Sequence, residues 1–113
     1  MSLWLNVFAV MDYLQKLFKS VSGETRLKIL LLLLQRKELS VGEITATLEG
    51  KVSTISRNLT ILERDNFVKA KHISSNVYYS INNNPRYRYN RAILQVLRLR
   101  LEESKIRKKL ENL

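Results

Sequence analysis

The sequence predicts a mainly α-helical fold with one small β-hairpin. Three observations support this. Apolar residues recur at helical spacing through most of the chain, a short polar turn separates two amphipathic segments after residue 40, and two β-rich runs follow before residue 82. Residues 40–81 therefore read as helix, turn, helix and hairpin, which is the order of a winged helix-turn-helix.

Length and composition fit one folded domain. The chain has 113 residues, 45% of them apolar and 27% charged, with three Gly and one Pro. We expect a single domain over 1–113, made of an N-terminal helix at 1–21, a winged-helix core at 22–81 and a C-terminal helix at 85–113. The longest apolar run, Ile29 to Leu34, is far too short to span a membrane, and the N-terminus does not resemble a signal peptide.

The charge balance predicts a polyanionic partner. Twenty Lys and Arg face ten Asp and Glu, a formal net charge of +10, and residues 86–113 alone hold nine basic and three acidic residues. Nucleic acid is favoured over membrane lipid, because the basic residues do not line one face of a single amphipathic helix. The absence of Cys excludes disulfides and thiolate metal sites and fits a reducing cytoplasm.

The segments before the second amphipathic helix carry recognisable helix signals. Ser22 is expected to cap a helix that is apolar on nearly every side up to about residue 36, which marks it as the central buried helix. Ser40 and Glu43 have the spacing of a capping box at the start of the next helix. Gly50 is expected to permit the sharp turn after it.

The segment from Val52 to about Arg64 is the predicted recognition helix. Ile55, Leu59 and Leu62 form its buried stripe, and polar residues occupy the rest of its surface. Arg can bond the guanine edge and Asn the adenine edge, Ser and Thr suit phosphates or either base type, and Lys51 is expected to meet a phosphate. The residues predicted to contact DNA here are Lys51, Ser53, Thr54, Ser56, Arg57 and Asn58.

The hairpin is expected to form from strands at 67–73 and 77–81. Its second strand is β-branched and aromatic, and a short polar tip joins the two. Five residues of this wing can reach the DNA backbone or the minor groove, with a plain solvated turn as the alternative: Lys69, Lys71, Ser74, Ser75 and Asn76.

Both terminal helices carry apolar stripes at heptad spacing. The N-terminal helix either packs inside its own monomer or is shared with a second subunit. Because one small core cannot easily cover both stripes, we expect a homodimer. The predicted interface residues are Trp4, Val7, Met11, Leu14, Phe18, Val96, Leu99, Ile106 and Leu110.

Residues 19–81 resemble the ArsR-type winged-helix regulators. The residues from Ser22 to Leu30 are similar to that family's S-x-x-T-R-L-x-I-L pattern, and Ser53 to Leu59 are similar to S-T-V-S-R-H-L, with Asn58 in place of His. Val77 to Ser80 match the second wing strand. The resemblance implies a winged-helix DNA-binding protein with dimer helices at both ends.

The departures from that family's pattern concern metals. Ser40 and Gly42 stand where the metal sensors carry Cys-x-Cys, and the last helix has no His. Because these ligands are missing, we expect no metal and no cofactor. In a separate departure, Lys51 replaces the usual small polar residue before the recognition helix.

Together these patterns predict a sequence-specific regulator of transcription that binds double-stranded DNA as a homodimer. Two alternatives remain open, namely an architectural DNA-binding protein with low specificity and a winged-helix module that binds another protein. Enzyme activity is not expected, because the chain has no Gly-rich phosphate loop and no nucleophile with a matching His and acid.

Overall fold

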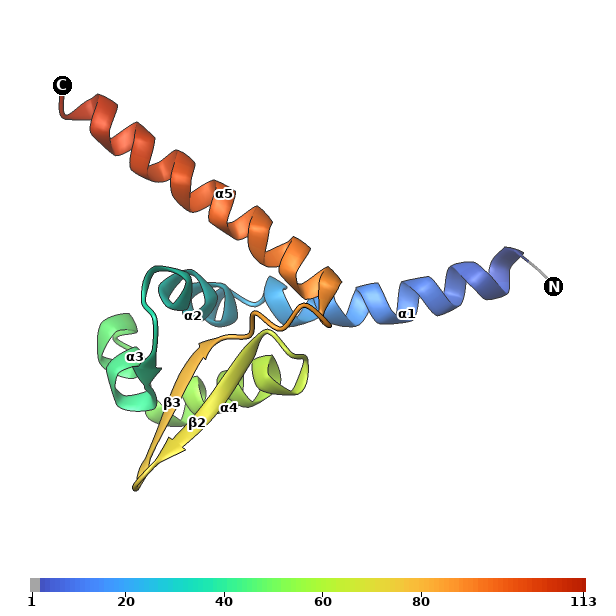
Figure 1. Ribbon diagram of the computed structural model, residues 1–113, viewed down its shortest axis with the longest axis horizontal. Helices are drawn as coiled ribbons and strands as arrows, with labels where there is room; N and C mark the ends of the chain where they lie inside the picture. The colour runs from blue at the N-terminus through green and yellow to red at the C-terminus, as the bar shows by residue number, and fades with distance from the viewer. Residues whose placement is uncertain (1–2) are drawn as a thin grey trace.

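The computed structural model describes residues 3–113 as five helices and a small antiparallel sheet (Figure 1). The element bounds, in chain order, are α1 Leu3–Ser22, α2 Glu24–Gln35, β1 Leu39–Ser40, α3 Val41–Leu48, α4 Val52–Arg64, β2 Val68–Ile73, β3 Asn76–Ile81 and α5 Arg88–Glu111. The predicted winged helix-turn-helix is confirmed, with α3 and α4 as the helix pair and β2–β3 as the wing.

Helix α2 lies at the centre of the fold, as its all-round apolar sequence predicts. It contacts α1, α3, α4, α5 and strand β3. Its residues Ile29, Leu30 and Leu33 are buried, and they join core side chains from α4, the wing and α5. Leu94 is the fully buried contribution of α5 to this cluster. One hydrophobic core therefore positions α4 and the wing together.

One predicted helix signal needs correction and another is confirmed. Helix α1 continues through Ser22, whose hydroxyl bonds back to the carbonyl of Lys19, and Gly23 is the residue that precedes α2. The predicted Ser22 cap is therefore wrong, because α1 extends through the position that a cap would need. The capping box of Ser40 and Glu43 is present, and the backbone amide and side chain of Ser40 hold the pKa of Glu43 below its usual range.

The turn between α3 and α4 uses Gly50 in a different way from the prediction. Glu49, with φ of 54°, is the residue in the left-handed region, and no glycine in the described chain has positive φ. A Cβ added to Gly50 would lie 3.2 Å from Cδ1 of Ile55. The glycine therefore permits a close approach between the turn and the buried side of α4.

The sheet contains one strand that the sequence pattern did not predict. Strand β1 has only two residues and pairs with β3, so the strand order is β1-β3-β2. The wing strands pair from Val68 with Ile81 to Ile73 with Asn76. Ser74, with φ of 55°, begins the two-residue tip. A two-residue strand shows no alternation in sequence, which is why only its pairing reveals it.

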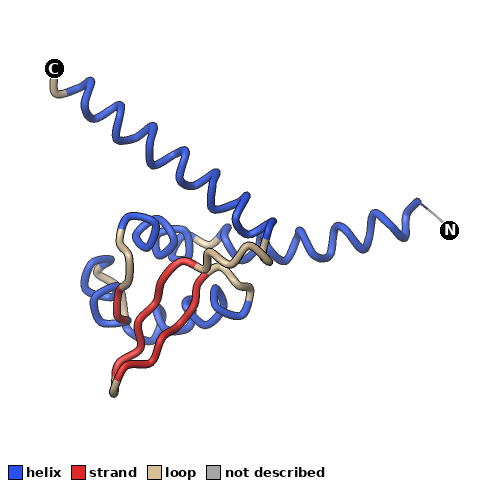
Figure 2. The backbone as a smooth tube through the Cα atoms, in the orientation of Figure 1, coloured by secondary structure: helices blue, strands red, loops and turns tan. Residues whose placement is uncertain are grey.

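The two terminal helices extend well beyond the core. Figure 2 shows α1 and α5 diverging from the same region, with their outer ends far from the sheet and from each other. Only the C-terminal part of α1 is buried, through Leu17, Ser20 and Val21. No helix among residues 3–113 is long and apolar enough to cross a membrane.

Candidate nucleic-acid interface

Helix α4 has one buried face and one polar face. Ile55, Leu59 and Leu62 are almost completely buried in the core. Arg57 and Ser53 are exposed, as is Lys51, which precedes the helix without a side-chain capping bond. Thr54 and Ser56 are half-buried on the flanks. The helix is thus anchored by its apolar side, and its polar side is free to meet a ligand.

Four polar side chains in the N-terminal half of α4 make no hydrogen bond or ion pair within the described chain. Among the described residues, no hydrogen bond or ion pair involves the side chains of Ser53, Thr54, Ser56 or Arg57. A guanidinium that is exposed and unpaired keeps all five of its donors available. Arg57 therefore has the availability that a base-reading or phosphate-binding side chain requires.

Asn58 differs from the other predicted contact residues. Its Nδ2 donates to the carbonyl oxygen of Thr54 at 2.9 Å, and its Oδ1 accepts from Nη1 of Arg26 at 2.8 Å. Both ends of the amide are thus bonded within the protein. Pairing with an adenine edge would need the same donor and acceptor. The sequence pattern placed Asn58 on the helix but gave no sign of this partner.

The wing presents basic residues on the sheet face that points away from the core. Lys69 and Lys71 are exposed and alternate with buried Val68 and half-buried Ala70. They line a concave region of about 990 Å³ at the base of the wing, which also includes Arg36, Lys37 and Arg98. No residue of α4 lines it. Ser74, Ser75 and Asn76 are exposed at the wing tip.

Three of these basic residues were not predicted as site residues. Arg36 and Lys37 follow α2 in a short charged segment, and Arg98 comes from α5. Each looks like an ordinary surface charge in sequence, because only the fold brings the end of α2, the wing and α5 to one groove. Together with Lys69 and Lys71 they form a cationic surface that suits phosphate groups.

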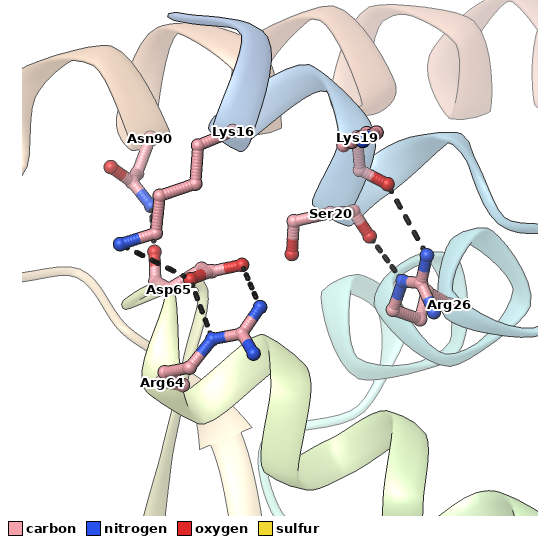
Figure 3. Close-up of polar contacts among 7 residues, drawn as sticks. All are labelled: Lys16, Lys19, Ser20, Arg26, Arg64, Asp65 and Asn90. Atoms are coloured by element: carbon pink, nitrogen blue, oxygen red, sulfur yellow. Dashed lines mark hydrogen bonds and ion pairs between the residues drawn. The ribbon is translucent and has the colours of Figure 1, made fainter. Parts of the chain in front are cut away.

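The C-terminal end of α4 holds a buried carboxylate. Asp65 is 3% exposed. Its Oδ1 and Oδ2 accept hydrogen bonds from Arg64 at 3.1 and 3.2 Å, and its Oδ1 also lies 3.6 Å from Nζ of Lys16 on α1 (Figure 3). Burial opposes ionisation, but bonding and charge from Arg64, with help from Ser20 and Lys16, hold the pKa of Asp65 below its usual range. The Asp65 carboxylate thus links α4 to α1.

The predicted dimer residues lie on the two extended helices. Leu14 is half-buried, and the other eight are exposed, among them Leu99 at 54% and Ile106 at 58%. Phe8, Val10 and Tyr13 add to the apolar surface of α1. Contiguous apolar surfaces of this extent are uncommon on monomeric proteins and mark interaction sites. The described chain contains no group of three or more metal-ligating side chains.

The similarity of the chain to known proteins agrees with this geometry. A profile described as "Bacterial regulatory protein, arsR family" matches residues 23–70. The solved structure of reduced HlyU from Vibrio cholerae is 30% identical to this chain with a TM-score of 0.68, and the match covers 81% of this chain and 92% of HlyU. This chain belongs to the ArsR family. The resemblance seen in the sequence is thereby confirmed.

The ArsR-family chain also matches two curated transcriptional regulators over part of its length. It is 40% identical over 65 residues to the transcriptional activator HlyU of Vibrio cholerae, and 34% identical over 67 residues to the transcriptional repressor SmtB homolog of Synechocystis sp.. These matches cover 58% and 59% of this chain, and they span 59% and 50% of those curated relatives. The chain therefore spans only about half to three fifths of the length of these curated relatives.

A third relative resembles the chain over more of its length. The solution structure of Mb0332 from Mycobacterium bovis is described as a homodimeric winged helix-turn-helix DNA-binding domain. It is 25% identical to this chain with a TM-score of 0.69, and the match covers 84% of this chain and 83% of Mb0332. The ArsR-type fold thus extends over most of the chain.

Proposed function

We propose that this ArsR-family protein is a transcription regulator that binds double-stranded DNA, with α4 in the major groove. The observation that carries the proposal is the polar side of α4. Ser53 and Arg57 are exposed and have no partner in the described chain, while the opposite side is fixed in the core. A rigidly held helix with free hydrogen-bonding groups is what base reading requires.

We infer that the basic surface contributes affinity for DNA, whereas the polar side of α4 contributes sequence specificity. Lys51, the wing lysines and the cationic groove lie outside the polar side of α4 and suit phosphates. The wing tip residues Ser74, Ser75 and Asn76 suit the backbone or the adjacent minor groove. We expect these groups to contribute salt-dependent affinity, while Arg57, Ser53, Thr54 and Ser56 supply sequence preference.

We also propose that the protein works as a homodimer joined by α1 and α5. Eight of the nine predicted interface side chains are exposed in the single chain, and both helices project beyond the core. Burying them against a two-fold mate removes this apolar surface from water and presents two copies of α4 to one duplex. The homodimeric state described for Mb0332 supports this assembly.

We further infer that residues 1–113 belong to one domain and that the protein works in the cytoplasm, where DNA and reduced proteins meet. The core cluster of the described residues, which joins side chains from all five helices and the wing, supports the inference of one domain. The proposal assigns no catalytic step to the protein, whose expected activity is direct contact with DNA.

Selection from a random duplex pool is the experiment that tests the proposal. The full chain should enrich a palindromic site with half-sites about one helical turn, or a multiple, apart. Affinity for this site should exceed that for random duplex by about 1000-fold or more at physiological salt. Enrichment of no motif, with equal affinity for all duplexes, would contradict specific binding and favour an architectural role.

A further inference from the structure

Arg26 joins three elements of the fold through one guanidinium group. Its Nε donates to the carbonyl oxygen of Ser20 at 2.5 Å and its Nη2 to that of Lys19 at 3.2 Å, both at the end of α1 (Figure 3). These carbonyls belong to the last turn of α1, which has no helical partners for them. The third donor, Nη1, bonds Oδ1 of Asn58 on α4 at 2.8 Å.

Gly23 provides the space in which this guanidinium sits. A Cβ added at Gly23 would lie 2.9 Å from Nη2 and 3.0 Å from Cζ of Arg26. Real Cβ atoms do not approach other atoms so closely, so any side chain at this position would displace the guanidinium. The φ of Gly23 is −70°, which every residue type adopts. A side chain at this position would therefore disturb the guanidinium of Arg26 and would not strain the backbone.

We propose that Arg26 is a positioning residue that fixes α4 relative to α1, and that Asn58 serves as its acceptor and not as a reader of bases. Both ends of the Asn58 amide are bonded within the protein, Nδ2 to Thr54 and Oδ1 to Arg26. Arg26 itself is half-buried and places no donor on the exposed side of α4. This inference rests on the proposed DNA-binding function of α4.

A second contact between the same two helices makes the link rigid. Lys16 on α1 lies 3.6 Å from the carboxylate of Asp65, which ends α4. Asn58 and Asp65 are seven residues apart, so α4 is tied to α1 about two turns apart along its axis. Two separated contacts fix the direction of a helix, whereas one contact permits rotation about it.

The consequence concerns the distance between half-sites. In a dimer joined through α1 and α5, the angle between α1 and α4 sets how far apart the two α4 helices lie. A fixed angle makes the protein selective for one spacer length between the half-sites. A loosened angle should let one protein accept several spacers. Arg26 thus acts on spacing and has no direct effect on which base is read.

The test uses the full chain and the site selected from the duplex pool, together with versions in which one base pair is inserted into or removed from the spacer. Three variants are compared. Asn58→Leu removes the acceptor, and Arg26→Lys keeps the positive charge but loses the planar guanidinium. Gly23→Ala should displace Arg26 without changing either Arg26 or Asn58. Arg100→Lys is the matched control, because Arg100 bonds only exposed Glu103.

We expect the wild-type protein to prefer the native spacer over both altered ones, and the three variants to lose about tenfold of that preference. The control should keep it. Affinity for random duplex and its salt dependence should be unchanged, because no phosphate contact is altered. Asn58→Asp, which retains an acceptor for Arg26, should preserve the spacer preference. Thermal unfolding of each variant separates loss of folding from loss of positioning.

Two results would overturn the inference. If Asn58→Leu keeps the spacer preference but loses selectivity at one base position, Asn58 reads DNA and does not position the helix. If all three variants lower the melting temperature while the spacer preference is unchanged, the contacts serve stability alone. Failure of the wild-type chain to bind any duplex would be a different result, because it would overturn the proposed function itself.

Discussion

Asn90 on α5 donates a hydrogen bond of 2.7 Å from its Nδ2 to the backbone carbonyl of Asp65, which ends α4. Asn90 is 1% exposed, so water cannot replace this bond. The carboxylate of the same aspartate reaches Lys16 on α1. Both terminal helices therefore contact the C-terminal end of α4 at one residue.

The Asp65 carboxylate should make stability depend on acid pH. Because its pKa in the folded protein is held below the usual range, the ionised form stabilises the fold above about pH 4. This contribution is lost as pH falls through the usual carboxyl range towards the lower folded value. Asp65→Asn should lose about 1–2 kcal/mol of unfolding free energy at pH 7 and show a flatter acid decline.

Urea unfolding measured from pH 7 down to about pH 2.5 checks this expectation. The quantity to compare is the difference in unfolding free energy between wild type and Asp65→Asn, since other carboxyl groups titrate in both proteins. That difference should shrink as the pH is lowered. A difference that stays constant across the series would show that ionisation of Asp65 contributes nothing.

Arg57→Ala should weaken binding to the selected site by about 1–3 kcal/mol and relax the preference at one base position. The reason is that the Arg57 side chain is exposed on α4 and bonds no described residue, so its removal affects DNA contacts and leaves the core intact. Electrophoretic mobility shift titrations with the selected site and single-base variants measure this effect.

Lys105→Ala on the outer part of α5 is a suitable control for Arg57→Ala, because it removes one exposed positive charge elsewhere. The control should lower affinity for all duplexes alike, if it lowers it at all. Wild-type affinity and selectivity in the Arg57→Ala variant would show that this arginine is not a base reader.

Leu99→Lys combined with Ile106→Lys should disrupt the homodimer. Leu99 and Ile106 are both exposed on α5 in the single chain. Lysines at these positions would have to be buried without partners in the proposed dimer interface. Light scattering should give a dimer mass for the wild type and a monomer mass for the double variant, with loss of tight binding to the palindromic site. A monodisperse wild-type monomer at micromolar concentration would refute the dimer.

Zinc or arsenite at stoichiometric concentration should leave the affinity for DNA unchanged. The chain has no Cys and a single His, and Ser40 and Gly42 occupy the positions of the family's thiolate ligands. Calorimetry with each metal, followed by DNA titration in its presence, measures this. A tight stoichiometric site coupled to release of DNA would contradict the expectation.

The sequence by itself determined the order of the five helices and the hairpin, and the apolar faces that form the core. Helical spacing at Ile55, Leu59 and Leu62 identified the buried side of α4, and the spacing of Ser40 and Glu43 identified the start of α3. These signals are local, since each depends on residues within a few positions of one another. For the same reason the ArsR resemblance could be read directly from short motifs.

Only the tertiary structure decided which residues far apart in the sequence bond to each other. Arg26 and Asn58 are 32 residues apart, and Asp65 and Asn90 are 25 apart, so no local pattern reveals either bond. Strand β1 exists only because β3 supplies its partner. The residue type of Asn58 suits an adenine edge, and only the fold shows that its Oδ1 accepts a hydrogen bond from Arg26. Hydrogen bonding depends on proximity in space, which the chain acquires only when it folds.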